Sequence, residues 1–194
     1  ALGDIVFIHA RRNSTKDEGP ARYHGTTPLV YHVTVHDIDL VLWYLSGKKP
    51  VTVYAQKVSK TLSSMKMDDA IFSIVRFDDG TVVNFESSWA LPEGSTTKLD
   101  AYMEICGTKA MAKVDCGQSL IFFDSTSTAT PDMFSWPVLR NEVMGDLREE
   151  LSHFVRCIIE DKEPIVSVQD GLESLRLAIA MDHSADTNEI VVLS

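Results

Sequence analysis

The sequence lacks the signals of a membrane or secreted protein. No apolar run approaches the roughly 18 residues that a membrane span requires. The first residues do not have the basic, apolar and small-residue pattern of a signal peptide. Its cysteines, Cys106, Cys116 and Cys157, are odd in number and far apart, without a C-x-x-C pair. This pattern favours a reducing cytoplasm over a disulfide framework or a thiolate zinc site.

The sequence also lacks the common nucleotide and nucleophile motifs. It contains no G-x-G-x-x-G, no G-x-x-x-x-G-K-[ST] and no G-x-S-x-G. The chain by itself therefore carries no recognisable dinucleotide or phosphate cradle. Its net charge is −10, from 18 basic and 28 acidic residues, which argues against binding to nucleic acid or to an anionic membrane.

The patterns that are present predict one α+β domain over residues 1–194. Alternating or apolar runs bounded by turn residues predict strands near 3–12, 51–58, 70–77, 81–89, 101–106, 110–115, 119–124 and 190–193. Tight turns join most of them, so we expect a large, mainly antiparallel meander. Apolar residues at helical spacing predict helices at 31–46, at 147–158 and after Ser167, the last with Leu172, Leu175, Ile179 and Met181 on its inner face.

The predicted sheet has apolar side chains on both faces. In the strand at 70–77, Ile71, Val75 and Phe77 alternate with Phe72 and Ile74. The helices of one chain gather on one face only. We therefore expect a second subunit to cover the other face, giving a homo-oligomer.

The segment 31–47 is the strongest candidate for chemistry. It places His32 and His36 four residues apart, a spacing that puts both on one face of an α-helix. One interpretation is acid–base catalysis, because histidine titrates near neutral pH. A second is metal binding, although Val33 stands where H-E-x-x-H has its glutamate. A third is a structural role. Thr34 and Asp37 also form a possible capping box.

Several segments in the same order resemble a known family, the C-terminal domain of the Gfo/Idh/MocA oxidoreductases (glucose–fructose oxidoreductase and inositol dehydrogenase). The similarity covers nearly the whole chain and lies in HDIDL with WYLSG, FDDGTVVNFESSW, MEICGTKA and ELSHFVRCIIEDKEPIVSVQDGLESLRLAIAMDHSA. Family members are NAD(P)-dependent and act mostly on sugars, inositols and related polyols. The resemblance implies an N-terminal Rossmann domain that binds NAD or NADP and a C-terminal α+β domain whose open sheet mediates dimers or tetramers.

The resemblance also implies roles for particular residues. The family's catalytic histidine corresponds to His36, the general acid/base on the substrate hydroxyl. An aspartate usually stands four residues earlier, where this chain has His32, which can hydrogen-bond a hydroxyl but supplies no fixed negative charge. We add Trp89 and Tyr23 as candidate substrate-binding residues.

The Rossmann domain and its catalytic lysine are not in this sequence. We therefore expect the chain to be the substrate-binding and oligomerisation part of a longer dehydrogenase, inactive and unable to bind NAD when isolated. The rival hypothesis is a non-catalytic ligand sensor or assembly protein on the same fold, which the replacement of the aspartate by His32 favours.

Overall fold

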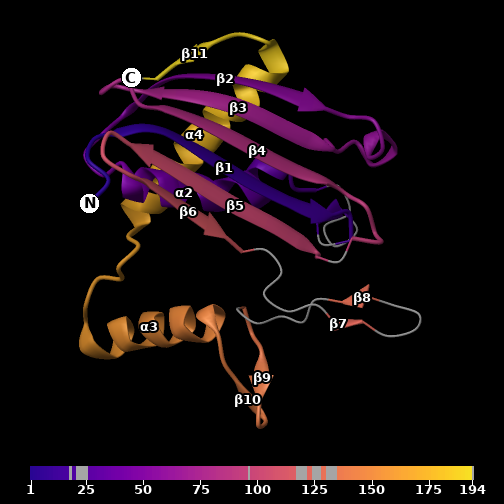
Figure 1. Cartoon of the computed structure of the whole chain (residues 1–194), viewed down its shortest axis with the longest axis vertical. Coiled ribbons are helices and arrows are strands. Elements are labelled where there is room, and N and C mark those ends of the chain that lie inside the picture. Colours follow the sequence, from indigo (N-terminus) through magenta and orange to yellow (C-terminus); the bar gives the residue numbers. More distant parts are fainter. Residues whose placement is uncertain are drawn as a thin grey trace. The chain divides into compact units, whose positions relative to one another are not determined.

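The computed structural model describes residues 1–17, 19–20, 26–95, 97–116, 122–123, 128–129 and 135–193. The chain divides into two compact units (Figure 1). The first contains Ala1–Gly117 and Leu172–Ser194, and the second contains Gln118–Gly171. The sheet, its covering helices and the candidate site all belong to the first unit.

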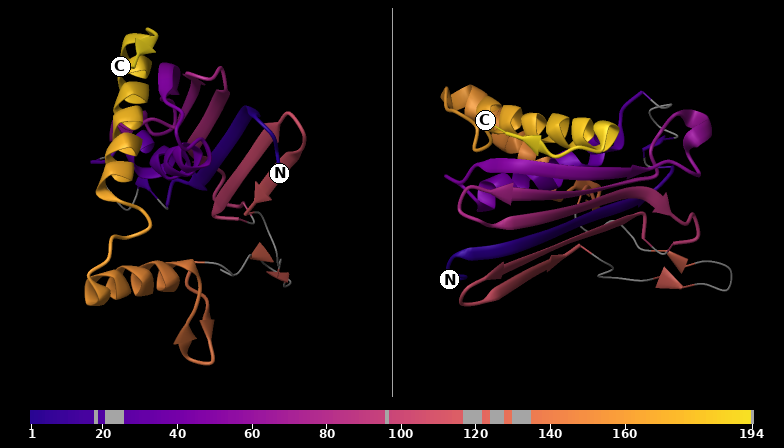
Figure 2. Two further views of the ribbon diagram at one scale, coloured as in Figure 1. Left: turned by 90° about the vertical axis from the view of Figure 1, so that its left-hand side faces the viewer. Right: turned by 90° about the horizontal axis from the view of Figure 1, so that it is seen from above.

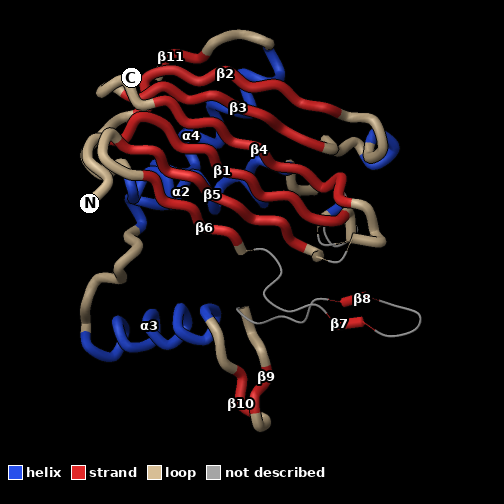
Figure 3. Tube along the Cα trace, viewed as in Figure 1, coloured by secondary structure: helices blue, strands red, loops and turns tan. Residues whose placement is uncertain are grey.

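The first unit is built on a seven-stranded sheet with the order β11-β2-β3-β4-β1-β5-β6 (Figure 3). Its strands are β1 (Ile5–Thr15), β2 (Pro50–Val58), β3 (Ala70–Phe77), β4 (Val82–Leu91), β5 (Leu99–Gly107), β6 (Met111–Asp115) and β11 (Val191–Val192). All neighbours are antiparallel except β1 and β4, which are parallel. The mainly antiparallel α+β prediction is confirmed, but β1 lies between β4 and β5, so the simple meander is wrong there.

Alternation of side chains sets which face of the sheet is buried. Ile71, Val75 and Phe77 of β3 are buried, whereas Phe72 and Ile74 are exposed, as the pattern predicts. The hairpin between β3 and β4 turns at Gly80, whose φ of +93° suits glycine because it has no Cβ. The face with the buried side chains is the one that the helices cover.

Two helices cover the same side of the sheet (Figure 2): α2 (Val35–Tyr44) and α4 (Val168–Thr187), which belongs to the first unit from Leu172 onward. A π-helix, η1 (Val30–Thr34), leads directly into α2, and a short 3-10 turn, η2 (Ser63–Met65), lies between β2 and β3. Among the described residues, no helix is both long and apolar enough to cross a membrane.

The predicted inner face of α4 is wrong for three of its four residues. Met181 is buried, but Leu172, Leu175 and Ile179 are exposed. The buried residues of α4 are mostly small, with Leu177 and Met181 as the two long side chains: Ser174, Leu177, Ala178, Ala180, Met181 and Ser184. Small side chains let α4 approach the sheet closely: the backbone N–H of Ala55 in β2 donates to Ser184 Oγ at 3.0 Å.

The second unit contains the helix predicted at 147–158, observed as α3 (Asp146–Glu160). It ends at Asp161, which adopts a left-handed conformation with φ of 52°. Short strand pairs complete this unit: β7 (Phe122–Phe123) with β8 (Thr128–Ala129), and β9 (Val138–Leu139) with β10 (Glu142–Val143). The rest of the predicted strand at 119–124 lies outside the described residues.

Asp69 organises the turn between β2 and β3. Its carboxylate is buried and accepts hydrogen bonds from the backbone N–H groups of Lys60, Thr61 and Leu62 and from the Thr61 hydroxyl. Burial alone would raise the pKa of Asp69, but these hydrogen bonds outweigh it and lower the pKa below its usual value. The charged carboxylate therefore stabilises the turn.

We predict that Asp69→Asn lowers the free energy of unfolding by roughly 2 kcal/mol at pH 7, because a buried charged acceptor is lost. Since the folded pKa is depressed, the stabilisation is complete above the ordinary carboxyl pKa of about 3.9 and is lost as pH falls through the lower folded value. Urea unfolding of the unsubstituted and variant chains at pH 7 and pH 3 measures the loss of stability and its dependence on pH. Asp4→Asn, at an exposed position, is the control. A deficit that does not shrink at pH 3 would contradict this account.

Candidate functional site

His36 stands in the first turn of α2 and is exposed. The buried side of that helix is formed by Asp37, Ile38 and Val41, so His36 lies on the outer side. The candidate acid/base is thus available to a ligand, as a proton-transfer role requires. Its catalytic role stays a prediction.

His32 lies in different surroundings because of the π-helix. The backbone N–H of Val35 bonds the carbonyl of Val30, five residues earlier, so the chain makes a wider turn than an α-helix between the two histidines. His32 is half-buried, and its ring centroid is 6.1 Å from that of Trp89, at an interplanar angle of 43°. Such π segments occur frequently at functional sites.

Trp89 is part of the hydrophobic core, with 2% of its surface exposed. Gly19 approaches it so closely that a Cβ on Gly19 would overlap the indole ring. The indole Nε1 is buried and has no hydrogen-bond partner among the described residues. Trp89 is therefore a buried ring next to the His32 ring, and its substrate-binding role stays a prediction. Tyr23 lies outside the described residues.

A buried ion pair holds the first turn of α2 on the sheet. Arg12 of β1 donates from Nη2 to Asp37 Oδ1 at 2.7 Å and from Nε to Oδ2 at 3.0 Å. The Asp37 side chain is 6% exposed and that of Arg12 is 21% exposed. Two parallel bonds between planar groups fix orientation as well as distance. The pair thereby fixes the turn that carries His36.

The expected capping box is not formed. The Thr34 side chain makes no capping bond to α2, and its hydroxyl donates instead to Ser87 Oγ of β4 at 3.0 Å. Asp37 is used by Arg12. Both polar side chains reach the sheet, because burial under the helix leaves them no water and requires them to pair with buried groups.

The π-helix is also fastened to α4. The Tyr31 hydroxyl donates to Asp182 Oδ2 at 3.0 Å, and Lys57 of β2 binds Asp182 at 2.6 Å and Asp186 at 2.8 Å. Burial, followed by the bond to Asp182, raises the pKa of Tyr31 to about 12. The segment that presents His32 is thus tied to β4 on one side and to α4 on the other.

Arg12 is the residue of this site that the sequence patterns did not predict. In β1, alternate side chains point to the same face of the sheet, and Arg12 shares the buried face with Ile8 and Ala10. A charged residue at a core position is costly unless it is paired. A charged residue on the buried face of a strand, together with an acidic residue on the covering helix, is a signal that could have identified Arg12.

The described residues contain no group of three or more His, Cys, Asp or Glu side chains placed to hold a metal ion. The metal interpretation of the histidine pair therefore lacks a third ligand within this part of the chain.

Comparison with known families identifies the chain. Residues 1–193 match the family model described as the oxidoreductase family, C-terminal alpha/beta domain. The chain belongs to the Gfo/Idh/MocA oxidoreductase family. The resemblance inferred from the ordered motifs is confirmed. A search of curated proteins finds no match.

Solved structures of this family have the same fold. The chain is 17% identical to myo-inositol 2-dehydrogenase from Lactobacillus plantarum, with a TM-score of 0.77 over 100% of this chain and 58% of that one. The chain is also 17% identical to scyllo-inositol dehydrogenase from Lactobacillus casei, a structure with bound NAD(H) and scyllo-inositol. The TM-score is 0.70 over 98% of this chain and 57% of that one. It is 20% identical to a myo-inositol dehydrogenase from Corynebacterium glutamicum, with a TM-score of 0.70 over 100% of this chain and 57% of that one. The chain thus spans little more than half the length of these dehydrogenases.

We predict that Arg12→Met lowers the free energy of unfolding by about 3 kcal/mol, because it leaves the Asp37 carboxylate buried without a partner. Arg12→Lys should not restore full stability, since an ammonium cannot form both parallel bonds. The double variant Arg12→Met/Asp37→Leu should recover much of the loss, because no buried charge remains. Chemical denaturation of the unsubstituted chain, of these three variants and of the single variant Asp37→Leu measures these differences. Additive losses in the double variant would refute the coupling.

Proposed function

We propose that this chain is the substrate-binding and oligomerisation part of an NAD(P)-dependent oxidoreductase that acts on a sugar, inositol or related polyol. The observation that carries the proposal is the exposed His36 on a helix turn fixed by a bidentate ion pair. An acid/base must meet its substrate in a defined position, and this arrangement supports both requirements.

In the proposed oxidation, the neutral imidazole of His36 accepts the proton of the substrate hydroxyl as a carbonyl forms. The bound nicotinamide would supply the acceptor for the hydride that leaves the same carbon. In reduction, His36 returns the proton to the carbonyl oxygen. His32 would hydrogen-bond the same hydroxyl, and Trp89 would support the His32 ring.

The cofactor does not fit the residues of this chain, because the sequence contains no glycine-rich dinucleotide motif. We therefore assign NAD or NADP binding to a further domain of a longer protein. The related dehydrogenases, of which this chain covers 57–58%, are long enough to contain such a domain. The isolated chain should neither bind NAD nor turn over substrate.

A second candidate is a non-catalytic ligand sensor or assembly protein. It is supported by His32, which stands where the resemblance implies an aspartate and is half-buried against Trp89. Without a carboxylate at position 32, the aspartate–histidine pair that the resemblance implies would not be formed. Ligand binding by the full-length protein without turnover of any tested polyol would favour the sensor.

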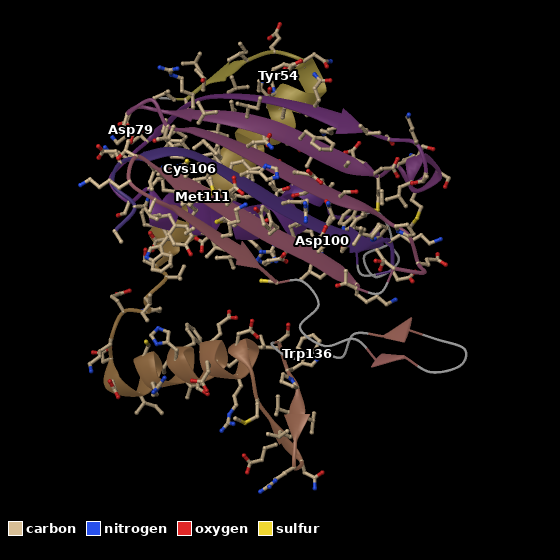
Figure 4. All side chains as sticks on the ribbon, viewed as in Figure 1. Tyr54, Asp79, Asp100, Cys106, Met111 and Trp136 are labelled. Carbon is tan, nitrogen blue, oxygen red and sulfur yellow. The ribbon has the colours of Figure 1, made fainter. Side chains whose placement is uncertain are left out.

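We further propose that the open sheet face forms a homo-oligomer. This face is defined by the side chains opposite the helices, and Figure 4 looks onto it, with Tyr54, Cys106, Met111 and Asp100 labelled. Ile74 lies across from Tyr54 and is 54% exposed, and Phe72 is 45% exposed. Large apolar groups exposed side by side are typical of subunit interfaces.

The centre of the open face is polar and partly paired within the chain, although Arg11 Nε and Asn13 Oδ1 are buried there without a hydrogen-bond partner among the described residues. Arg11 binds Asp100 at 2.9 Å and lies 5.2 Å from the ring centroid of Tyr102. Asn13 donates to Glu86 at 2.8 Å. Charges that are already neutralised within one chain can be covered by a partner at lower desolvation cost than unpaired ones.

The free cysteines Cys106, Cys116 and Cys157 support our placement of the protein in a reducing cytoplasm.

For catalysis, we predict that His36→Gln in the full-length enzyme lowers kcat by roughly 100-fold or more with little change in KM, because a general base is lost. The acid limb of the pH–rate profile for oxidation should disappear with it, since protonated imidazole cannot accept a proton. Turnover of a sugar and polyol panel with NAD and NADP measures this. His183→Gln, an exposed histidine on α4, is the control. Full activity of His36→Gln would contradict the assignment.

For assembly, we predict that this chain is oligomeric and that Ile74→Glu weakens association by at least ~10-fold, because a charge would replace an apolar contact at the interface. Sedimentation equilibrium measures the change. Ser64→Glu adds the same charge at an exposed position outside the face. Equal association of both variants would assign the interface elsewhere.

A further inference from the structure

Lys57 lies at the end of a chain of polar contacts that leads to the π-helix. Its Nζ atom donates to Asp182 Oδ1 at 2.6 Å, and the Tyr31 hydroxyl donates to the other oxygen of that carboxylate, Oδ2, at 3.0 Å. The Asp182 side chain of α4 therefore joins β2 to η1. We call these three residues the carboxylate bridge, and all of them belong to the first unit.

One ammonium group serves three carboxylates at this place. Besides Asp182, Lys57 Nζ binds Asp186 at 2.8 Å and lies 3.8 Å from Asp68. Burial alone would lower the pKa of Lys57, but the bonds to Asp182 and Asp186 outweigh it and raise the pKa. Lys57 therefore stays charged at neutral pH. Without that charge the carboxylates would repel one another, and Asp182 would no longer be held as the acceptor for Tyr31.

The carboxylate bridge is one of two polar anchors on η1, and the two bind different elements. Tyr31 is bonded to α4, whereas Thr34 is bonded to Ser87 of β4. In an α-helix three residues turn through about 300°, so Tyr31 and Thr34 would lie only about 60° apart around the axis. A π turn contains more residues, which separates the two side chains further around the axis and lets each reach its own partner. The anchors thus favour a π turn over an α turn.

The π turn sets the position of His32. It inserts one extra residue before α2, so an α turn in its place would rotate His32 around the axis by about 100°, the angle of one residue. A rotation of this size would move the imidazole away from Trp89, whose ring centroid lies 6.1 Å from that of His32. The contact between the two rings therefore depends on the π turn.

We propose that the carboxylate bridge is a positioning device for His32, and that Lys57 supplies the charge that holds it together. This inference rests on the proposed function, in which His32 hydrogen-bonds the substrate hydroxyl. It adds to that function a residue of another strand that fixes where His32 stands. Lys57 does not itself touch the substrate, because it acts through the π turn.

Trp89 reports the position of His32. This chain is labelled with 5-fluorotryptophan, and Trp43→Phe and Trp136→Phe assign two of the three fluorine resonances, so the third belongs to Trp89. His32→Ala gives the position of that resonance without a neighbouring imidazole. We expect Tyr31→Phe, which removes the hydroxyl of the carboxylate bridge, to move the Trp89 resonance towards that position.

Variants of Lys57 test the role of its charge. Lys57→Met should move the Trp89 resonance as Tyr31→Phe does, whereas Lys57→Arg should restore most of the original position, because arginine keeps a positive charge that binds carboxylates. Tyr102→Phe is the matched control: its hydroxyl donates to Glu104 Oε2 at 2.7 Å on the open face, and its loss should leave the Trp89 resonance in place. A resonance that neither Tyr31→Phe nor Lys57→Met moves would overturn the inference.

Turnover by the full-length protein tests the role in the reaction. We expect Tyr31→Phe to lower kcat/KM for a polyol by roughly 10-fold, because a displaced hydrogen-bonding group costs transition-state stabilisation. In a His32→Ala background the same change should cost less than ~2-fold, since the residue through which it acts is gone. An equal loss in both backgrounds would show that Tyr31 acts without His32 and would overturn the inference.

The inference and the proposed function fail in different ways. Loss of turnover in His36→Gln together with full turnover in His32→Ala would overturn the inference and leave the proposed function intact. Absence of turnover with every polyol tested would contradict the proposed function. The Trp89 resonance would then still decide whether the carboxylate bridge positions His32.

Discussion

The bidentate pair between Arg12 and Asp37 is the interaction on which the arrangement of the site depends. It joins the first turn of α2 to β1, a strand that itself sits between β4 and β5 in the middle of the sheet. Because a planar guanidinium and a planar carboxylate meet through two bonds, the helix is fixed in rotation as well as in position. That rotation decides that Ile38 and Val41 enter the core and that His36 stays outside.

The same rotation gives the first unit two distinct surfaces. On the helix side, His36 leads into the apolar residues Leu40 and Trp43. On the other side of the sheet, exposed apolar groups surround a polar centre that is partly paired within the chain, as at Arg11 and Asp100. The function that we propose requires two such surfaces, one for a cofactor domain and one for a partner subunit, and a single sheet with helices on one side provides them.

Local patterns were sufficient for most elements but not for their long-range pairing. Alternation and the tight turn expected between them predict β3 and β4 correctly, because these depend on neighbouring residues. The insertion of β1 between β4 and β5 depends on pairing with distant strands, which no local pattern encodes. His36 was singled out from its spacing and from the family resemblance, and its catalytic role stays a prediction. The π-helix at His32 and the role of Arg12 were not predicted, since both follow from tertiary contacts such as Thr34 with Ser87.

The central claim is that α2 is fixed with His36 facing outward and His32 turned toward Trp89. Histidine ring proton signals of this chain, recorded with a soluble paramagnetic agent, test it directly. The account predicts strong broadening for His36 and much weaker broadening for His32, with the contrast reduced in Arg12→Met. Equal broadening of the two rings, or a protected His36, would contradict it.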